Sequence, residues 1–136
     1  MKKLIILILL ISIPSAASFA QKKAADYLKA ALVATNNKNY AQAILLCDAA
    51  INLNNAYETA YFHRGYNKLL LKDYSGAIQD FGIVLSINTD NLDALLYRGM
   101  ANQKAGNRWA ATQDYNAARR IDAIETLAFV TGSIFR

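Results

Sequence analysis

An internal repeat of 34 residues constrains this chain more than any other feature of its sequence. Laid against itself at that offset, the chain aligns residues 24–57, 58–91 and 92–125. The matching columns are Tyr27/Tyr61/Leu95, Ala31/Gly65/Gly99, Tyr40/Tyr74/Arg108, Ala43/Ala77/Ala111, Cys47/Phe81/Tyr115, Ala50/Val84/Ala118 and Leu53/Ile87/Ile121. One unit of this length cannot bury its apolar face alone, whereas stacked copies share a continuous core. The sequence therefore predicts an array of three stacked units.

Each unit has the pattern of two helices joined by a short turn. Two apolar patterns of helical period are separated by polar residues at 36–39, 72–73 and 106–107. Helices joined by so short a link lie antiparallel. The Ala and Gly columns supply small residues where two backbones approach, and Phe81, four positions after Ala77, fills the space beside that contact. We therefore expect an all-α fold, an α-solenoid of three antiparallel helical hairpins.

These columns resemble the tetratricopeptide repeat family over nearly the whole of residues 21–136. The second unit matches best, through Ala60-Tyr61, Arg64-Gly65, Asp73-Tyr74, Ala77-Ile78, Phe81 and Val84-Leu85. The third unit repeats the pattern with Ala94-Leu95, Arg98-Gly99, Ala111, Tyr115 and Ala118. The proline that commonly closes the family's repeat is replaced by Asn55, Thr89 and Ala123, and Ala31 replaces the first glycine. The resemblance implies a right-handed solenoid that binds proteins and has no catalytic activity.

The first twenty residues have the pattern of a secretory signal peptide. Lys2 and Lys3 precede the apolar run 4–13, which is followed by Pro14 and a tract of small residues ending at Ala20. The run is only about half of the ~20 apolar residues that span a bilayer, which favours a cleaved signal over an uncleaved anchor. We expect cleavage near Ala20, with Ala17 as the competing site. The domain would then cover residues 21–136 in the periplasm or outside the cell, with no stable membrane insertion.

The C-terminal residues continue the repeat register. Residues 128–129 fall one period after Ala94-Leu95, so residues 124–136 are expected to form a partial capping helix. This cap is apolar, with Leu127, Phe129, Val130, Ile134 and Phe135. It fits a lid on the last hairpin, against which Trp109 would pack. It also fits an alternative function, a structural unit that forms homo-oligomers through residues 127–135.

Composition argues against several kinds of chemistry. The net charge of +5 is interspersed along the chain, which does not suit nucleic-acid binding. His63 and Cys47 are the only residues of their types, so a His-pair metal site and an intrachain disulfide are excluded. We expect no catalytic residue, metal or cofactor, and a buried Cys47. Asp48, Asp80 and Asp114 recur on the second helices and are expected to be solvated.

The family resemblance places a peptide-binding groove on the first helix of each hairpin. Carried over by position, the groove residues are Leu28, Lys29, Leu32, Phe62, His63, Tyr66, Leu96, Tyr97, Met100 and Lys104, with Asn36, Thr59, Leu70 and Asp93 beside them. One subclass of the family clamps acidic chaperone tails with Lys, Asn and Arg at these places. Here the places are mostly apolar or aromatic, which favours an amphipathic helix or an apolar peptide of a partner protein. The stripe of Phe62, Tyr66 and Tyr97 also fits plain core packing.

Overall fold

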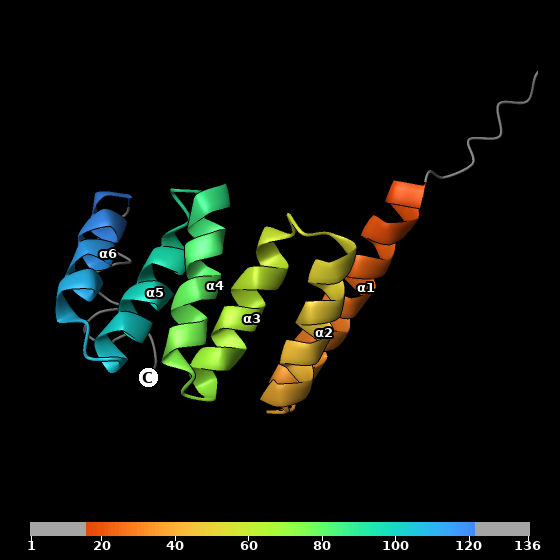
Figure 1. Ribbon diagram of the computed structural model, residues 1–136, viewed down its shortest axis with the longest axis horizontal. Helices are drawn as coiled ribbons and strands as arrows, with labels where there is room; N and C mark the ends of the chain where they lie inside the picture. The colour runs from red at the N-terminus through yellow and green to blue at the C-terminus, as the bar shows by residue number, and fades with distance from the viewer. Residues whose placement is uncertain (1–15, 122–136) are drawn as a thin grey trace, which may run out of the picture.

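The computed structural model describes residues 16–121, through which six α-helices run (Figure 1). They are α1 (Ala16–Asn36), α2 (Tyr40–Leu53), α3 (Glu58–Leu70), α4 (Tyr74–Ile87), α5 (Leu92–Lys104) and α6 (Arg108–Ile121). From α2 onward the helix boundaries recur with the offset of the sequence repeat. No strand occurs within residues 16–121, which confirms the all-α prediction.

The helices pair into three hairpins that follow one another along the long axis of the molecule (Figure 1). Within a hairpin, α1 packs on α2, α3 on α4, and α5 on α6. Between hairpins, α2 packs on α3 and α4 on α5. The first helix of each hairpin also contacts the next first helix, α1 with α3 and α3 with α5. The three first helices therefore line one face of an α-solenoid, as predicted.

The turns within the hairpins share one backbone geometry. Lys38, Lys72 and Gly106 occupy the same repeat position and have φ angles of 59°, 64° and 88°. This left-handed conformation ends a helix and reverses the chain within a few residues. Asn39 and Asp73 follow directly and cap the next helix, their side-chain oxygens accepting hydrogen bonds from backbone N–H groups at 3.3 and 2.9 Å. The polar breaks of the sequence are therefore caps and turns.

Small residues allow the two helices of a hairpin to approach closely. A Cβ atom added at Gly99 would lie 2.6 Å from Cε1 of Tyr115, and one at Gly65 would lie 3.2 Å from Cε1 of Phe81. The aromatic ring of the second helix thus covers the glycine of the first. Around Phe81 a buried apolar cluster joins the second and third hairpins, and a smaller one around Cys47 joins the first hairpin to Ala60 of α3.

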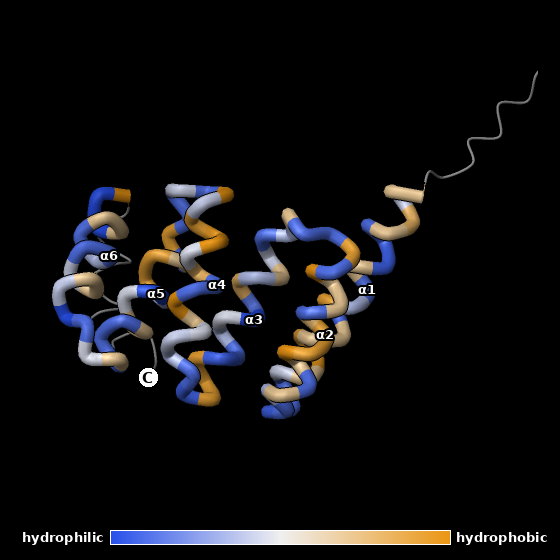
Figure 2. Tube along the Cα trace, in the orientation of Figure 1, coloured by the Kyte–Doolittle hydropathy of each residue, from blue (hydrophilic) through white to orange (hydrophobic). Residues whose placement is uncertain are grey.

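The last described helix presents polar residues where its equivalents are buried. Ile51 of α2 and Leu85 of α4 are buried, whereas Arg119 of α6 is exposed at the same repeat position. Figure 2 shows α6 as more hydrophilic than α4. This polar surface distinguishes α6 from α2 and α4, on which α3 and α5 pack.

The two terminal predictions fall mainly outside the described residues. Residues 1–15 of the expected signal peptide and the expected cap at 124–136 are not among them, so the lid and the contact surface 127–135 remain predictions. Helix α1 begins at Ala16 and continues through Ala20, the expected cleavage point. Trp109, expected to pack on the cap, has 77% of its surface exposed. Within residues 16–121, no helix combines the length and apolar character that crossing a bilayer requires.

The two glycine environments predict opposite effects of alanine. Gly99→Ala should lower the free energy of unfolding by about 1–2 kcal/mol, because overpacking against Tyr115 outweighs the gain in helix propensity. Gly82→Ala should raise it by about 0.5–1 kcal/mol, since the nearest atom to its Cβ is 3.9 Å away. Urea unfolding of both variants measures the difference. Equal stability of the two would contradict the close approach of α5 and α6.

Candidate functional site

Two adjoining cavities open on the face made by the first helices. One, of about 260 Å³, is lined by Leu32, Thr35, Asn36, Phe62, His63, Tyr66 and Tyr97. The other, of about 450 Å³, is lined by Tyr66, Leu69, Leu70, Lys72, Tyr74, Tyr97, Met100 and Lys104. Tyr66 and Tyr97 line both, so the two cavities adjoin and together hollow the face of α1, α3 and α5. We call this hollow the aromatic groove.

The floor of the aromatic groove is a set of rings in edge-to-face contact. The ring centroid of Tyr97 lies 5.7 Å from that of Phe62 and 5.4 Å from that of Tyr66. Phe62 also meets the fully buried ring of Phe81 at 5.6 Å. Such pairs contribute about 0.5–1.5 kcal/mol each beyond their buried area. The half-buried rings therefore pack on the core with one side and line the groove with the other. The stripe of Phe62, Tyr66 and Tyr97 is thus both part of the core packing and part of the groove.

Most of the predicted groove residues line this hollow, and three do not. Leu28 and Leu96 are buried in the two apolar clusters, so their assignment to the groove was wrong. Leu96 precedes Tyr97 by one residue, and the ~100° rotation per residue of a helix turns it away from the face. Lys29 is exposed on α1 but lines neither cavity.

Some groove residues lie outside the predicted set. They are Thr35, Leu69, Lys72 and Tyr74, of which Lys72 comes from the turn after α3 and Tyr74 from the start of α4. A transfer by position from the first helices cannot reach Lys72 and Tyr74. Thr35 and Leu69 do lie on first helices, at one repeat position that the transfer left out. The polar break at residues 72–73 is the sequence signal that could have indicated that the turn after α3 borders the groove.

The centre of the aromatic groove carries no charged side chain. Lys72 and Lys104 both line the larger cavity, and neither forms an ion pair with a described carboxylate. Burial lowers the pKa of His63, so the ring lining the groove favours its neutral form. Burial is also the main cause of the raised pKa of Tyr97. The groove suits apolar and aromatic groups.

A buried amide holds the first hairpin against the second beside the groove. Asn67 is fully buried, and its side chain accepts a hydrogen bond of 2.9 Å from the hydroxyl of Thr35. The same amide donates a hydrogen bond of 2.7 Å to the carbonyl oxygen of His63. Both polar ends of the amide are thus satisfied, and α1 is fixed relative to α3.

Two aspartates of the second helices, Asp80 and Asp114, are buried, which corrects the expectation that they are solvated, whereas the side chain of Asp48 is 40% exposed. Asp80 and Asp114 are only 1% and 5% exposed. Each is paired with an arginine of the first helix in its hairpin, Arg64 and Arg98, at 2.6 Å. Arg64 and Asp80 recur as Arg98 and Asp114 one repeat later, so the sequence repeat itself could have indicated these ion pairs. Asp48 differs, since it pairs with Arg64 from the preceding hairpin at 2.7 Å.

Cys47 is a buried apolar residue, as predicted. Its side chain is fully buried, and burial raises the pKa of the thiol to about 12. The thiolate that would react is therefore disfavoured. Within residues 16–121, no group of three His, Cys, Asp or Glu side chains could hold a metal ion.

Comparison with known proteins finds curated proteins that match a short part of the sequence and solved structures that match the fold. No protein-family model matches the chain. It is 44% identical over 57 residues to RNA polymerase II-associated protein 3 of Xenopus tropicalis, covering 42% of this chain and 9% of that protein. It is 43% identical over 54 residues to DnaJ protein P58IPK homolog A of Oryza sativa subsp. japonica, covering 40% and 11%. The chain thus spans about a tenth of the length of these curated relatives.

Solved structures match over a larger share of the chain. The TPR domain of Arabidopsis OM64 superposes with a TM-score of 0.74 and 25% identity, covering 76% of this chain and 86% of that one. The second TPR of Spaghetti (RPAP3) gives a TM-score of 0.75 at 20% identity, covering 79% and 98%. Together with the internal repeat, these matches show that the chain has the fold of tetratricopeptide repeat domains, and they support the resemblance to that family.

The double role of Phe62 predicts a stability loss on truncation. Phe62→Ala should lower the free energy of unfolding by about 2–3 kcal/mol, because it removes ring contacts to Phe81 and Tyr97. Leu70→Ala, which truncates an exposed groove residue, should cost less than about 1 kcal/mol. Chemical denaturation of the two variants tests this order. A Phe62 variant as stable as the parent would show that the ring is not part of the core.

His63 predicts a pH-dependent stability. Because its pKa is lowered in the folded chain, acidification through about pH 6.5 protonates the unfolded chain first. The contribution of the neutral ring is present above that pH and is lost as the pH falls towards the folded-state pKa. His63→Gln should therefore flatten the decline in melting temperature between about pH 7 and pH 5. Equal slopes for the two proteins would contradict the buried, neutral histidine.

Proposed function

We propose that the chain is an exported protein-interaction module whose aromatic groove binds an apolar peptide or amphipathic helix of a partner protein. The observation that carries this proposal is the groove itself, a hollow floored by Phe62, Tyr66 and Tyr97 on the face made by the first helices, in which Lys72 and Lys104 are the charged lining residues. Rings that are fixed by the core and exposed on one side lose little freedom when a ligand packs on them.

Related structures support a peptide as the class of ligand. Both TPR domains of Spaghetti (RPAP3) have been solved with the HSP90 peptide SRMEEVD. The second TPR domain of human RPAP3 has been solved with the HSP70 peptide SGPTIEEVD. Those peptides end in acidic residues. The centre of the groove in the present chain offers no cation to an acidic tail, so the proposed ligand is apolar.

The dimensions of the groove suit a segment with two or three anchors. Each aliphatic or aromatic side chain that leaves water for such a surface contributes about 1.5–3 kcal/mol. On an amphipathic helix, anchors at i, i+3 or i+4, and i+7 lie along one face. Such a row would follow the groove from Leu32 on α1, past Tyr66 and Tyr97, to Met100 on α5.

The N-terminal sequence supports the cell envelope or the exterior as the location. The order of basic, apolar and small residues before Ala20 is that of a secretory signal. Cell fractionation, with mass spectrometry of the exported chain, measures both the location and the new N-terminus. A chain recovered only from the cytosol with its first twenty residues intact would contradict export.

Two exposed leucines allow the groove to be tested apart from the core. Leu32 lines the smaller cavity of the groove and Leu70 the larger one, and they are 37% and 38% exposed. Leu32→Gln combined with Leu70→Gln should weaken peptide binding at least about 10-fold, since each loses an apolar contact, and should change the melting temperature little. The matched control is Leu45→Gln, which alters a 62% exposed leucine on α2 outside both cavities.

The probe for this test is a library of random 12-residue peptides displayed on phage and selected on the purified chain. Enriched peptides should be rich in apolar residues, and fluorescence polarisation gives their dissociation constants for each variant. Retention of affinity in the Leu32/Leu70 variant would place the binding elsewhere. Failure to enrich any peptide would contradict the proposed function.

A further inference from the structure

The arginine of the second hairpin is held by carboxylates from two sides. Arg64 donates from Nε and Nη2 to Asp80 of its own hairpin, at 3.0 and 2.6 Å. Its remaining nitrogen, Nη1, donates to Asp48 of the preceding hairpin at 2.7 Å. All three nitrogens of this guanidinium are thus used within the molecule.

The equivalent arginine of the third hairpin has only one of these partners. Arg98 donates from Nε and Nη2 to Asp114 of its own hairpin, at 3.1 and 2.6 Å. Gly82 occupies the repeat position that corresponds to Asp48. A Cβ atom added at Gly82 would lie 3.9 Å from Nη1 of Arg98. The glycine therefore leaves Nη1 without the carboxylate that the second hairpin supplies.

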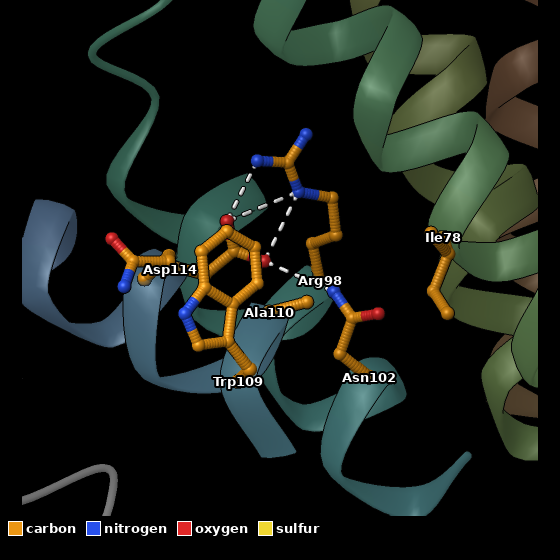
Figure 3. A pocket seen from close by; sticks show the side chains of 7 residues that line it. Ile78, Arg98, Asn102, Trp109, Ala110 and Asp114 are labelled. Carbon is orange, nitrogen blue, oxygen red and sulfur yellow. Dashed lines mark hydrogen bonds and ion pairs between the residues drawn. The ribbon is translucent and has the colours of Figure 1, made fainter. Parts of the chain in front are cut away.

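A pocket of about 350 Å³ opens at this arginine. Its lining residues are Ile78 of α4, Arg98 and Asn102 of α5, and Trp109, Ala110, Gln113 and Asp114 of α6. None of them belongs to the aromatic groove. In Figure 3, Ile78 lies across the opening from the residues of α6. The pocket thus places an exposed tryptophan and an isoleucine beside an arginine with an unused donor.

We propose that this pocket binds an acidic side chain of a partner protein, with an apolar side chain of the same partner next to it. The carboxylate takes the place on Arg98 Nη1 that Asp48 takes on Arg64. The apolar neighbour packs on Trp109 and Ile78. This surface lies apart from the aromatic groove and gives the module a second contact for a protein partner.

The local charges explain why both parts of the ligand are needed. In the second hairpin, Lys68 lies 2.9 Å from Asp80, so two cations balance two carboxylates. In the third hairpin, Asn102 replaces that lysine and donates to Asp114 at 3.2 Å. Arg98 and Asp114 already neutralise each other, so a carboxylate alone gains little. Contact with Trp109 supplies the remaining binding free energy, and the pocket selects an acidic residue flanked by an apolar one.

Gly82→Asp is the direct test, because it supplies the missing carboxylate from within the chain and so competes with a ligand. Gly82→Ala is its matched control, since it adds a side chain without a carboxylate. Trp109 is the only tryptophan in the sequence, so its fluorescence reports on this pocket alone. The probes are peptides selected from a random 12-residue library on the Leu32/Leu70 groove variant, in which binding to the aromatic groove is weakened.

Selected peptides should carry Asp or Glu beside an apolar residue and should shift the emission of Trp109. Replacing that acidic residue by its amide, or introducing Gly82→Asp, should each weaken binding at least 10-fold, whereas Gly82→Ala should retain it within 2-fold. Enrichment of no peptide, or binding that Gly82→Asp leaves unchanged, would overturn the proposal. A bound peptide shields Trp109 from water and moves its emission to shorter wavelength. If deletion of residues 122–136 from the isolated chain moves the emission to longer wavelength, the chain's own segment covers Trp109, which also overturns the proposal.

Discussion

The close approach of two helices at one small residue per repeat determines where the other functional side chains lie. In the second hairpin, Gly65 lies under the ring of Phe81. Arg64 precedes it and Tyr66 follows it, and successive helical residues point about 100° apart. With the glycine fixed against α4, Arg64 reaches the buried Asp80 and Tyr66 faces the aromatic groove. One packing contact thus sets the positions of both the buried ion pair and the ring of Tyr66 in the aromatic groove.

The sequence predicted the helices well because the repeat reports packing directly. The turns at Lys72 and Gly106 fall at the polar breaks, and the small residues lie where helices meet. It predicted side-chain environments less well. Leu96 adjoins the groove residue Tyr97 in sequence but packs in the core, since helical phase has to be known to within one residue. Asp80 is buried because of a partner on another helix, which periodicity within one helix does not reveal.

The comparison between repeats shows how one fold acquires different surfaces. The second and third hairpins share the pairing of first-helix arginine with second-helix aspartate, yet Asp48 is replaced by Gly82 and Lys68 by Asn102. The first hairpin has neither member of the pair. Repeat architectures tolerate such changes because each unit contacts only its neighbours. Function then depends on the residues that each repeat leaves exposed, while the scaffold stays the same.

The central claim is that the face of α1, α3 and α5 binds an apolar segment of a partner. Intermolecular NOEs between a selected peptide and the chain test it most directly, since they give the contact side chains without any substitution. The account predicts NOEs from apolar side chains of the peptide to the rings of Phe62, Tyr66 and Tyr97. A bound peptide with contacts only to α2, α4 and α6, and none to these rings, would contradict it.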